Sequence, residues 1–303
     1  MKHAYLIMAH NNIYILEKLI QLLDYEKNDI YIHIDKKVQN FDFKKIEKLI
    51  CKSNLFFTEQ IDVRWGDYSQ VEAILTLLKK ANYINKENKN VCGGYAYYHL
   101  LSGVDLPLRS QKEIHEILSK TPDREYIHFA PKTSCEKILY RYKYRYFYTK
   151  YLKDKGLKKL LYKIGRLNVL LQRILGMDRL AGKQTLLKYG SEWFSITNNL
   201  VEYILSKEDW IGKTYTNTLI PDESFIQTIV YNSKFYHNVY IQEKDDSEDY
   251  RACLRYIDWT RGNPYVWSLS DYKDLMKSKY LFARKFGDKE LVDKIYNNII
   301  NKL

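Results

Sequence analysis

Residues 4–35 read AYLIMAHNNIYILEKLIQLLDYEKNDIYIHID, and this stretch decides the fold class. It contains an apolar run, Tyr5–Met8, then a segment with apolar residues at helical spacing, Ile13–Leu23, and a second apolar run, Ile30–Ile34. Short apolar runs bounded by polar residues are typical of buried strands, and apolar side chains three or four residues apart are typical of a helix. The stretch therefore predicts a β-α-β unit.

The same alternation of strand and helix continues along the chain. From the spacing of apolar residues we expect a helix at Phe43–Ile50, a strand at Leu55–Thr58, a helix at Tyr68–Lys80, and strands at Tyr97–Leu101 and Glu125–Phe129. Repeated units of these lengths predict an α/β fold with a Rossmann-type, mostly parallel sheet that is covered by helices.

The second half of the chain is less regular. A strand begins within Gly190–Ile196, and Pro221 opens a helix that continues through Ser224–Tyr231. We expect the last segment, Ser270–Leu303, to be helical. Because no internal repeat and no Gly/Ser-rich linker divides the sequence, residues 1–303 are predicted to form one domain.

Three polar side chains follow predicted strands. His10, Asp35 and Asp105 each come shortly after an apolar run. In parallel α/β sheets, ligands bind outside the carboxyl ends of the strands. We therefore expect these three side chains to lie at one shared crevice.

The positive charge of the chain is concentrated in one segment. The net charge is +12, from 49 Lys and Arg against 37 Asp and Glu. Twelve of these cations and a single acid, Asp154, lie between Lys137 and Arg173, so the rest of the chain is nearly neutral. We interpret residues 137–189 as a basic, aromatic, helical insertion. We expect no nucleic-acid partner, because the charge belongs to this insertion and not to the protein as a whole.

Patterns typical of metal sites and of membrane spans are missing from the sequence. The four cysteines form no C-x-x-C pair and have no histidine at ligand spacing, so structural zinc is not expected. Scattered cysteines fit a reducing compartment. The apolar run at the N-terminus is far shorter than a membrane span, and no cleavage site follows it. We therefore expect a cytoplasmic protein.

Two acidic positions have sequence surroundings that suit catalysis or sugar binding. Glu223 falls in the first turn of a predicted helix, where the helix dipole favours the ionised carboxylate that a general base needs. Its alternative role is to stabilise that helix alone. Glu192 and Trp193 can hold a sugar, through hydrogen bonds to hydroxyl groups and through an indole face against the ring. A strand end with a buried tryptophan explains the same pair.

Two groups of cations have the composition of a diphosphate site. Arg284 and Lys285 interrupt an apolar, aromatic segment, and adjacent cations of this kind can clamp a diphosphate. A solvated pair on an amphipathic helix is the other interpretation. Arg261 is a further candidate of the same kind. The sequence has no Gly-rich phosphate loop and no D-x-D metal motif at the end of an apolar strand, so cations and no metal ion are expected to neutralise such a ligand.

Several short motifs along the chain are similar to those of one known family. They are Ala4–Ile7 with His10, Ile32–Asp35, Val63–Ser69, Ser102–Ser110 (of the form S-x-x-D-x-P-[IL]-[KR]-[ST]), Gly190–Phe194 (G-S-[DE]-W-F), Thr214–Phe225 and Phe282–Phe286. Together, and in this order, they resemble the Core-2/I-branching glycosyltransferase family, which includes β-1,6-N-acetylglucosaminyltransferases and peptide O-xylosyltransferases. The resemblance covers most of the chain, and the last two motifs are similar to the xylosyltransferase branch.

The resemblance implies a GT-A-like fold and a chemistry. The expected reaction is an inverting transfer from a UDP-sugar, UDP-N-acetylglucosamine or UDP-xylose, to a hydroxyl of a glycan or lipid-linked acceptor, with no metal and no other cofactor. By the resemblance, Glu223 is the catalytic base, and Arg284 and Lys285 stabilise the departing UDP.

The resemblance also assigns the remaining candidates. Asp35 is placed on the uridine side of the donor, at the crevice that we expect His10 and Asp105 to share with it. Glu192 and Trp193 are placed against the transferred sugar or the acceptor. Arg261 lies within one residue of a phosphate-binding arginine of the N-acetylglucosaminyl branch.

The basic insertion is a departure from the family pattern. It interleaves seven tyrosines and Phe147 with its cations, and its second part, Leu157–Leu175, has the spacing of an amphipathic helix. Our hypothesis is that residues 137–175 dock the protein on an anionic membrane surface beside a lipid-linked acceptor. A solvated helical hairpin over the acceptor site is an equally good interpretation. The animal enzymes' N-terminal anchor, stem and disulfides have no counterpart in this sequence, which implies a bacterial-type protein, cytoplasmic or peripheral at the inner face of the membrane.

Two other functions fit parts of the sequence. A non-catalytic basic protein that binds membranes or nucleic acid predicts steeply salt-dependent binding and no turnover. A metal-dependent GT-A transferase predicts loss of activity in EDTA.

Overall fold

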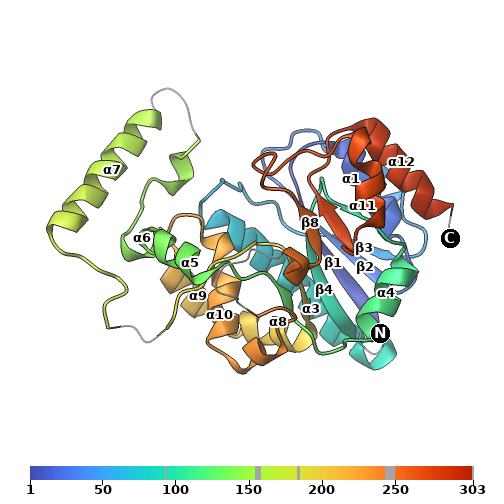
Figure 1. Ribbon diagram of the computed structural model, residues 1–303, viewed down its shortest axis with the longest axis horizontal. Helices are drawn as coiled ribbons and strands as arrows, with labels where there is room; N and C mark the ends of the chain where they lie inside the picture. Colours follow the sequence, from blue (N-terminus) through green and yellow to red (C-terminus); the bar gives the residue numbers. More distant parts are fainter. Residues whose placement is uncertain (93, 154–157, 183–184, 243–249, 302–303) are drawn as a thin grey trace.

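A six-stranded sheet lies at the centre of the molecule, with helices on both faces (Figure 1). The computed structural model describes residues 1–92, 94–153, 158–182, 185–242 and 250–301. The sheet contains, in spatial order, β3 (Asn54–Phe57), β2 (Asn28–Ile34), β1 (Lys2–Ala9), β4 (Tyr95–Ser102), β7 (Phe194–Thr197) and β6 (Tyr126–Ile127). Neighbouring strands run parallel except at β7, which is antiparallel to both of its neighbours. In register, His3 of β1 lies opposite Asn28 of β2 and Tyr97 of β4.

A second sheet and the helices complete the fold. The second sheet contains β5 (Leu106–Pro107), β9 (Phe282–Arg284) and β8 (Arg255–Ile257), in that order. The α-helices are α1 (Ile13–Leu23), α2 (Phe43–Glu47), α3 (Ser69–Cys92), α4 (Gln111–Ser119), α5 (Lys132–Ile138), α6 (Tyr140–Lys143), α7 (Lys158–Ile174), α8 (Asn198–Leu205), α9 (Glu208–Tyr215), α10 (Phe225–Tyr231), α11 (Tyr272–Lys277) and α12 (Lys289–Ile300). Short 3-10 turns are η1 (Thr149–Tyr151), η2 (Pro221–Glu223), η3 (Lys234–Asn238), η4 (Tyr250–Cys253) and η5 (Leu269–Asp271).

The predicted α/β class with a mostly parallel sheet is confirmed. The β-α-β unit predicted for residues 4–35 is β1, α1 and β2, and α1 has the predicted bounds, Ile13–Leu23. The helix predicted at Tyr68–Lys80 begins one residue later and continues to Cys92.

Alternate side chains of the central strands enter two separate cores. Tyr5 and Ile7 of β1 pack with residues of α1, α4, α11 and α12 on one face of the sheet. Ala4 and Leu6 pack with residues of α3, α8, α9 and α10 on the other face. Because side chains alternate between the faces along a strand, a sheet that is covered on both sides needs apolar residues at consecutive positions. This requirement explains the continuous apolar runs in the sequence.

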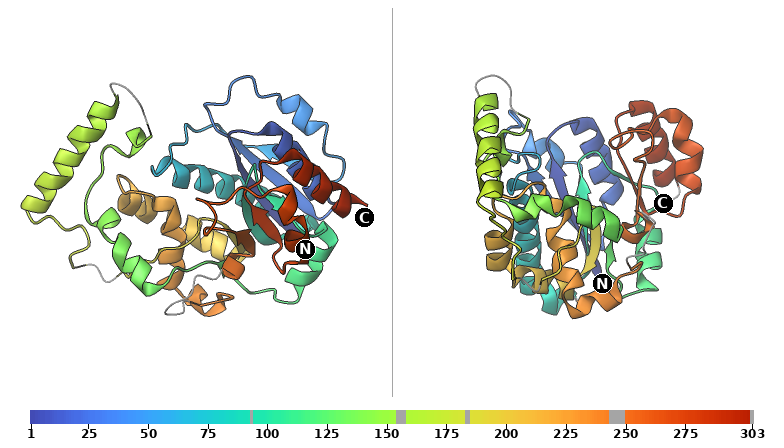
Figure 2. Two further views of the ribbon diagram at one scale, coloured as in Figure 1. Left: turned by 45° about the horizontal axis from the view of Figure 1, so that its top comes forward. Right: turned by 60° about the vertical axis from the view of Figure 1, so that its left-hand side comes forward.

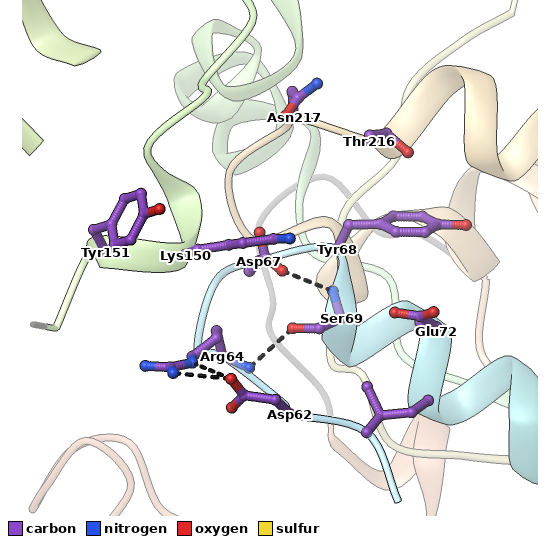
Figure 3. Close-up of a pocket in the computed structure, with 11 residues that line it drawn as sticks. Asp62, Arg64, Asp67, Tyr68, Ser69, Glu72, Lys150, Tyr151, Thr216 and Asn217 are labelled. Carbon is purple, nitrogen blue, oxygen red and sulfur yellow. Dashed lines mark hydrogen bonds and ion pairs between the residues drawn. The ribbon is translucent and has the colours of Figure 1, made fainter. Parts of the chain in front are cut away.

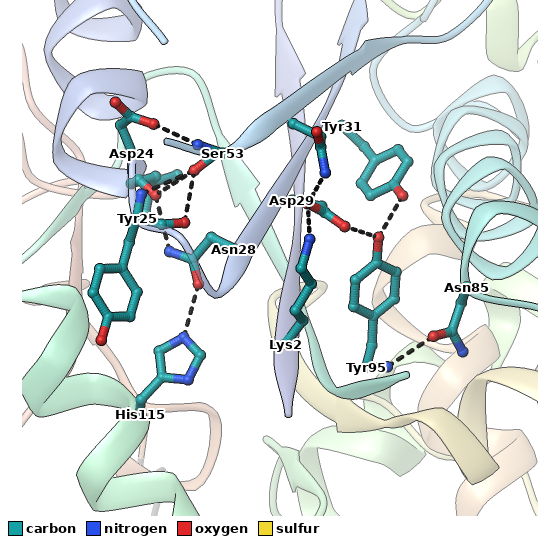
Figure 4. A network of polar contacts seen from close by, with 12 residues as sticks. Lys2, Asp24, Tyr25, Asn28, Asp29, Tyr31, Ser53, Asn85, Tyr95 and His115 are labelled. Carbon is teal, nitrogen blue, oxygen red and sulfur yellow. Dashed lines mark hydrogen bonds and ion pairs between the residues drawn. The ribbon is translucent and has the colours of Figure 1, made fainter. Parts of the chain in front are cut away.

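A polar network fixes the amino-terminal edge of the sheet (Figure 4). Lys2 Nζ lies 2.9 Å from Asp29 Oδ1, and the hydroxyl of Tyr95 donates to the same carboxylate. At the same edge, His115 on α4 contacts Asn28 of β2, with Nε2 2.8 Å from Oδ1. These contacts hold β1, β2, β4 and α4 together at the edge opposite to the candidate site described below.

The C-terminal segment differs from its predicted form. Ser270–Leu303 is not helical throughout, because β9 separates α11 from α12. Phe282 and Ala283 are fully buried, and β9 pairs with β5 and β8. Arg284 therefore ends a buried strand, and the interpretation of the cation pair as part of an amphipathic helix is wrong. A short apolar run does not by itself distinguish a strand from a buried helix.

Two parts of the predicted insertion, residues 137–189, lie differently against the protein. α6 lies against the body of the molecule, α7 stands at its far end, and η1 lies between α7 and the body (Figures 1 and 2). α7 corresponds to the amphipathic helix predicted at Leu157–Leu175, although Leu157 lies outside the described residues, as do 154–156 and 183–184. Within the described ranges, no helix is both long and apolar enough to cross a bilayer.

Candidate functional site

The carboxyl-terminal edge of the sheet brings together residues from distant parts of the chain. His10, Asp35 and Asp105 follow β1, β2 and β4 there, as the sequence predicts. Because β7 runs antiparallel to β4, its first residue lies at the same edge, and Trp193 directly precedes it. Arg284 reaches this edge from the end of β9 in the second sheet.

Asp105 and Arg284 form an ion pair at the junction of the two sheets. Ser102 donates to both carboxylate oxygens of Asp105, from its backbone N at 2.8 Å and from Oγ at 2.6 Å. Arg284 Nη1 lies 3.1 Å from Asp105 Oδ1 and 2.6 Å from Ser102 Oγ. Asp105 is completely buried, so it holds Arg284 in place and offers no exposed oxygen to a ligand.

Trp193 supports the same guanidinium. Arg284 Cζ lies 4.2 Å from the centre of the indole ring, within the range of a cation–π contact. The tryptophan is only 5% exposed. Its position agrees with the alternative interpretation, a buried tryptophan at a strand end, and the expectation that its face packs against a sugar is not supported by this packing.

Gly103 allows the turn before Asp105 to approach β1. Its backbone N donates to the carbonyl of Met8 at 2.9 Å. A Cβ at this position would lie 2.9 Å from Cβ of Ala9 and 3.3 Å from its Cα. A larger residue would therefore push the turn, and Asp105 with it, away from β1.

Asp35 and His10 occupy the ends of neighbouring strands. Lys37 contacts Asp35 twice, from its backbone N to Oδ1 at 2.9 Å and from Nζ to Oδ2 at 2.8 Å. Burial lowers the pKa of His10, the Asp35 carboxylate opposes this shift, and the charge of Lys285 adds to it. Arg284 also acts on His10. The predicted donor-side residues thus share one electrostatic environment.

Three carboxyl groups meet next to these cations. Glu192 and Asp222 act on each other, and Gln70 Nε2 donates to Asp222 Oδ2 at 3.0 Å. Burial, together with the neighbouring carboxylates of Glu192 and Glu223, raises the pKa of Asp222 well above its usual value. Burial raises the pKa of Glu192 to about 7, against the opposing effect of Arg284. The neighbouring carboxyl groups therefore disfavour full ionisation of the pair, because two adjacent like charges repel.

Glu223, the third carboxyl group, is held by Arg141. Arg141 Nη1 lies 3.1 Å from Glu223 Oε2, and the carboxylate side chain is 28% exposed. Burial raises the pKa of Glu223, whereas Arg141 and a hydrogen bond from Tyr189 lower it. The backbone N of Gly190 donates to the backbone carbonyl of Glu223 at 2.8 Å, and this bond fixes η2 against the segment that precedes β7.

The helix that was expected to include Glu223 begins after this residue. Glu223 ends the 3-10 turn η2, and α10 begins only at Phe225. The net effect of the surroundings is a raised pKa, so the expectation that a helix dipole favours the ionised form is wrong. A carboxylate whose pKa is raised toward neutrality is a better general base than an ordinary one.

Sequence reasoning missed Arg141 and Asp222 as members of the site. Arg141 belongs to α6 of the basic insertion, where one cation among twelve has no distinguishing spacing. Its side chain is only 16% exposed. Asp222 adjoins Glu223 in the sequence, and this adjacency was a signal that could have indicated it.

Arg261 lies apart from this arrangement. Its Nε lies 2.5 Å from Asp258 Oδ2 and its Nη1 lies 2.8 Å from Asp271 Oδ1, so two carboxylates neutralise its charge. Its Cζ is 5.3 Å from the Trp267 ring, whose Nε1 donates to the carbonyl of Arg284 at 2.8 Å. Arg261 thus braces the loop beside Arg284, and the structure does not bring its guanidinium to the other candidates.

A separate cavity of about 510 Å³ opens between the start of α3 and the turn η1 (Figure 3). Asp62, Arg64 and Ser69 line it from one side and Lys150 and Tyr151 from the other. None of the residues predicted for the site lines this cavity. The chemistry-bearing cluster and the cavity are therefore different places in the molecule.

Comparison with known proteins identifies relatives of the chain. Residues 3–275 match the family described as Core-2/I-Branching enzyme. The chain is 24% identical, over 310 residues, to a β-1,3-galactosyl-O-glycosyl-glycoprotein β-1,6-N-acetylglucosaminyltransferase from Bos taurus, covering 93% of this chain and 65% of that protein. It is also 24% identical, over 302 residues, to xylosyltransferase 2 from Mus musculus, covering 93% of this chain and 31% of that protein.

Among solved structures, mouse xyloside xylosyltransferase 1 in its apo form aligns with a TM-score of 0.39 and 11% identity, over 93% of this chain and 97% of that one. The chain spans about two thirds of the length of the bovine relative and about one third of that of the mouse xylosyltransferase 2. The family match covers nearly the whole chain in one continuous stretch, and the protein therefore belongs to the Core-2/I-branching enzyme family.

Proposed function

We propose that the protein is an inverting glycosyltransferase that moves a sugar from a UDP-sugar to a hydroxyl of a glycan or lipid-linked acceptor. The observation that carries this proposal is a half-buried carboxylate with a raised pKa, Glu223, beside Glu192, on which the fixed guanidinium of Arg284 also acts, in a member of this family. The charges of both residues act on Glu192, and this shared neighbour supports the proposal that they serve one site.

The proposed step is a single displacement. The acceptor hydroxyl oxygen forms a bond to the anomeric carbon, and the bond from that carbon to the β-phosphate oxygen breaks. Glu223 accepts the hydroxyl proton, and the bonding electron pair leaves with UDP. Attack from the side opposite to UDP inverts the anomeric centre.

Arg284 and Lys285 are proposed to neutralise the charge that develops on the leaving UDP. Asp105, Ser102 and Trp193 already fix the guanidinium of Arg284, so little reorganisation is needed when charge appears. Cations that occupy this place can take the role that a divalent ion has in other transferases. The names of the relatives support UDP-N-acetylglucosamine and UDP-xylose as the first donors to test.

Replacing the proposed base tests its role directly. We expect Glu223→Gln to lower turnover by about a hundredfold or more, since general base catalysis contributes on the order of 10²–10⁴ to a rate. UDP affinity is expected to stay within about twofold, because the amide keeps the size of the side chain. The measurement is UDP release from the UDP-sugar that gives the largest thermal shift, with Glu136→Gln as an exposed control. Unchanged turnover in Glu223→Gln would contradict the assignment.

The contact with Arg141 predicts a change in pH dependence. The base must be ionised, so activity falls as pH decreases through the pKa of Glu223. Arg141 lowers that pKa, and Arg141→Gln is therefore expected to move the acidic limb of the pH–rate profile upward by about one unit. The exposed Lys137→Gln in the same segment is the control and leaves the limb in place. An unchanged midpoint of the acidic limb in Arg141→Gln would show that Arg141 does not act on the base.

The cation pair predicts metal independence. Lys285→Ala is expected to weaken UDP binding about tenfold, because it removes a charged hydrogen-bond donor, and to slow turnover as well. Lys279→Ala, an exposed lysine nearby, serves as the control in calorimetric titration with UDP.

We expect turnover to persist in excess EDTA. Loss of turnover in EDTA that Mg²⁺ or Mn²⁺ restores would favour the metal-dependent alternative.

A further inference from the structure

We infer that the outer face of α7 is a docking surface for an anionic lipid bilayer, on which the helix lies in the plane of the interface. The surface is narrower than the segment 137–175 considered from the sequence. It consists of one face of Lys158–Ile174, and its binding does not depend on the proposed transferase activity.

The outer face of α7 is apolar and exposed. Ile164, Leu167 and Ile174 are 55%, 57% and 71% exposed. The large apolar side chains of this helix that are exposed are Leu160, Leu161, Ile164, Leu167, Leu170, Leu171 and Ile174. Surface helices of globular proteins normally turn such a stripe toward the core, and contiguous exposed apolar patches mark interaction surfaces.

A row of cations runs beside the apolar stripe. Lys159, Lys163, Arg166 and Arg173 each precede a residue of the stripe by one position, which corresponds to a rotation of about 100° around the helix. No Asp or Glu occurs from Lys158 to Ile174. Among the residues that the structure describes, these four cations have no carboxylate partner. Their charge is therefore available for a negatively charged surface.

The inner face of α7 is fixed to the body of the protein. Val169 packs with Tyr146 and Tyr148. Gln172 Oε1 accepts from the backbone N of Arg145 at 2.9 Å, and its Nε2 donates to the Arg145 carbonyl at 2.9 Å. A Cβ on Gly165 would lie 2.1 Å from the Tyr148 ring, so the helix and the ring are in close contact. This packing holds the apolar stripe away from the core.

The first part of the basic segment does not belong to the surface. Tyr142, Tyr146 and Tyr148 are 2%, 2% and 7% exposed, and Arg141 is bound to Glu223. These aromatic rings pack inside the protein and do not reach solvent. Tyr140 and Phe147 of this part are 46% and 56% exposed, but they lie apart from the continuous apolar stripe of α7. The inference is therefore limited to α7, and the wider hypothesis for 137–175 stays a prediction.

A bilayer fits the charge of this face better than a second copy of the chain. A symmetric contact through α7 would bring identical, uncompensated cationic rows close together, which is unfavourable. Anionic headgroups neutralise such a row, and the apolar stripe enters the boundary between headgroups and acyl chains. Helices with this division of charged and apolar residues lie on membranes and do not span them.

Vesicle flotation with the full chain tests this surface. The probes are phosphatidylcholine vesicles with about 30 mol% phosphatidylglycerol, and vesicles of phosphatidylcholine alone. We expect flotation with the anionic vesicles at low salt, weaker flotation in about 0.5 M salt, and at least tenfold less binding to the neutral vesicles. No flotation with anionic vesicles at low salt would overturn the inference.

Paired variants locate the binding on α7. Ile164→Ser/Leu167→Ser removes two apolar contacts and is expected to reduce binding to anionic vesicles about tenfold or more. Melting followed by circular dichroism verifies that this variant is folded, which is expected because both side chains are exposed. Binding by the folded variant at the level of the natural chain would overturn the inference.

Charge variants provide the matched comparison. Lys163→Gln/Arg166→Gln is expected to reduce binding at low salt on the order of tenfold. The control is Lys44→Gln/Lys48→Gln, which changes the net charge equally at exposed residues of α2 and its C-cap. This control is expected to leave binding within about twofold. Equal losses in both pairs would show a general charge effect and would overturn the assignment to α7. Analytical sedimentation tests whether the same face joins two copies of the chain. If the natural chain is a dimer, does not bind vesicles, and becomes a monomer in Ile164→Ser/Leu167→Ser, the stripe is a subunit interface and the inference is overturned.

Discussion

The ion pair between Asp105 and Arg284 is the contact on which the arrangement of the site depends. It joins the end of β4 in the central sheet to the end of β9 in the second sheet, so residues 179 positions apart meet at one edge. A completely buried carboxylate is unfavourable unless it is paired and hydrogen-bonded, and loss of one partner of such a pair costs about 3–5 kcal/mol. Ser102 and Arg284 together satisfy Asp105. The second sheet is thereby locked in the position that brings Arg284 and Lys285 beside His10.

The charged groups around this pair form a cationic side and an acidic side. On one side, cations collect near the strand ends, where a diphosphate would be neutralised. On the other side, burial raises the pKa of Glu192, Asp222 and Glu223, so that the three carboxyl groups do not all ionise together. Of these three carboxyl groups, Glu223 is the one that Arg141 contacts, and Arg141 lowers its pKa against the effect of burial. The basic insertion thus supplies a side chain to the site as well as an exposed helix to the surface.

Much of the fold follows from the sequence because both faces of the sheet are covered. A strand whose side chains enter both cores needs apolar residues at consecutive positions, as β1 and β2 have. In α1, between these strands, the apolar residues recur at helical spacing and form the buried face of the helix. The polar residues that end these strands, His10, Asp35 and Asp105, follow from the same reasoning, because parallel strands end at a common edge. Local patterns were insufficient where long-range pairing decides the structure, as in β9, whose partners are β5 and β8.

The site itself was only partly predictable. Glu223, Arg284 and Lys285 lie in motifs with recognisable neighbours, whereas the contact between Arg141 and Glu223 joins residues 82 positions apart and has no local signature. Trp193 and Arg261 were assigned to ligands from their residue types, but each is already engaged by protein groups, Trp193 by Arg284 and Arg261 by two aspartates. Residue type and spacing do not reveal which side chains are already paired in the folded chain.

In the proposed mechanism, fixed cations hold the diphosphate while a single glutamate faces the reacting sugar. A crystal structure of the complex with UDP tests it most directly. We expect the diphosphate oxygens within hydrogen-bond distance of Arg284 and Lys285, with no divalent ion between them and with Glu223 facing the open side of the β-phosphate. A diphosphate bound elsewhere, as in the cavity beside Arg64, or bridged to the protein by a divalent ion, would rule out this mechanism.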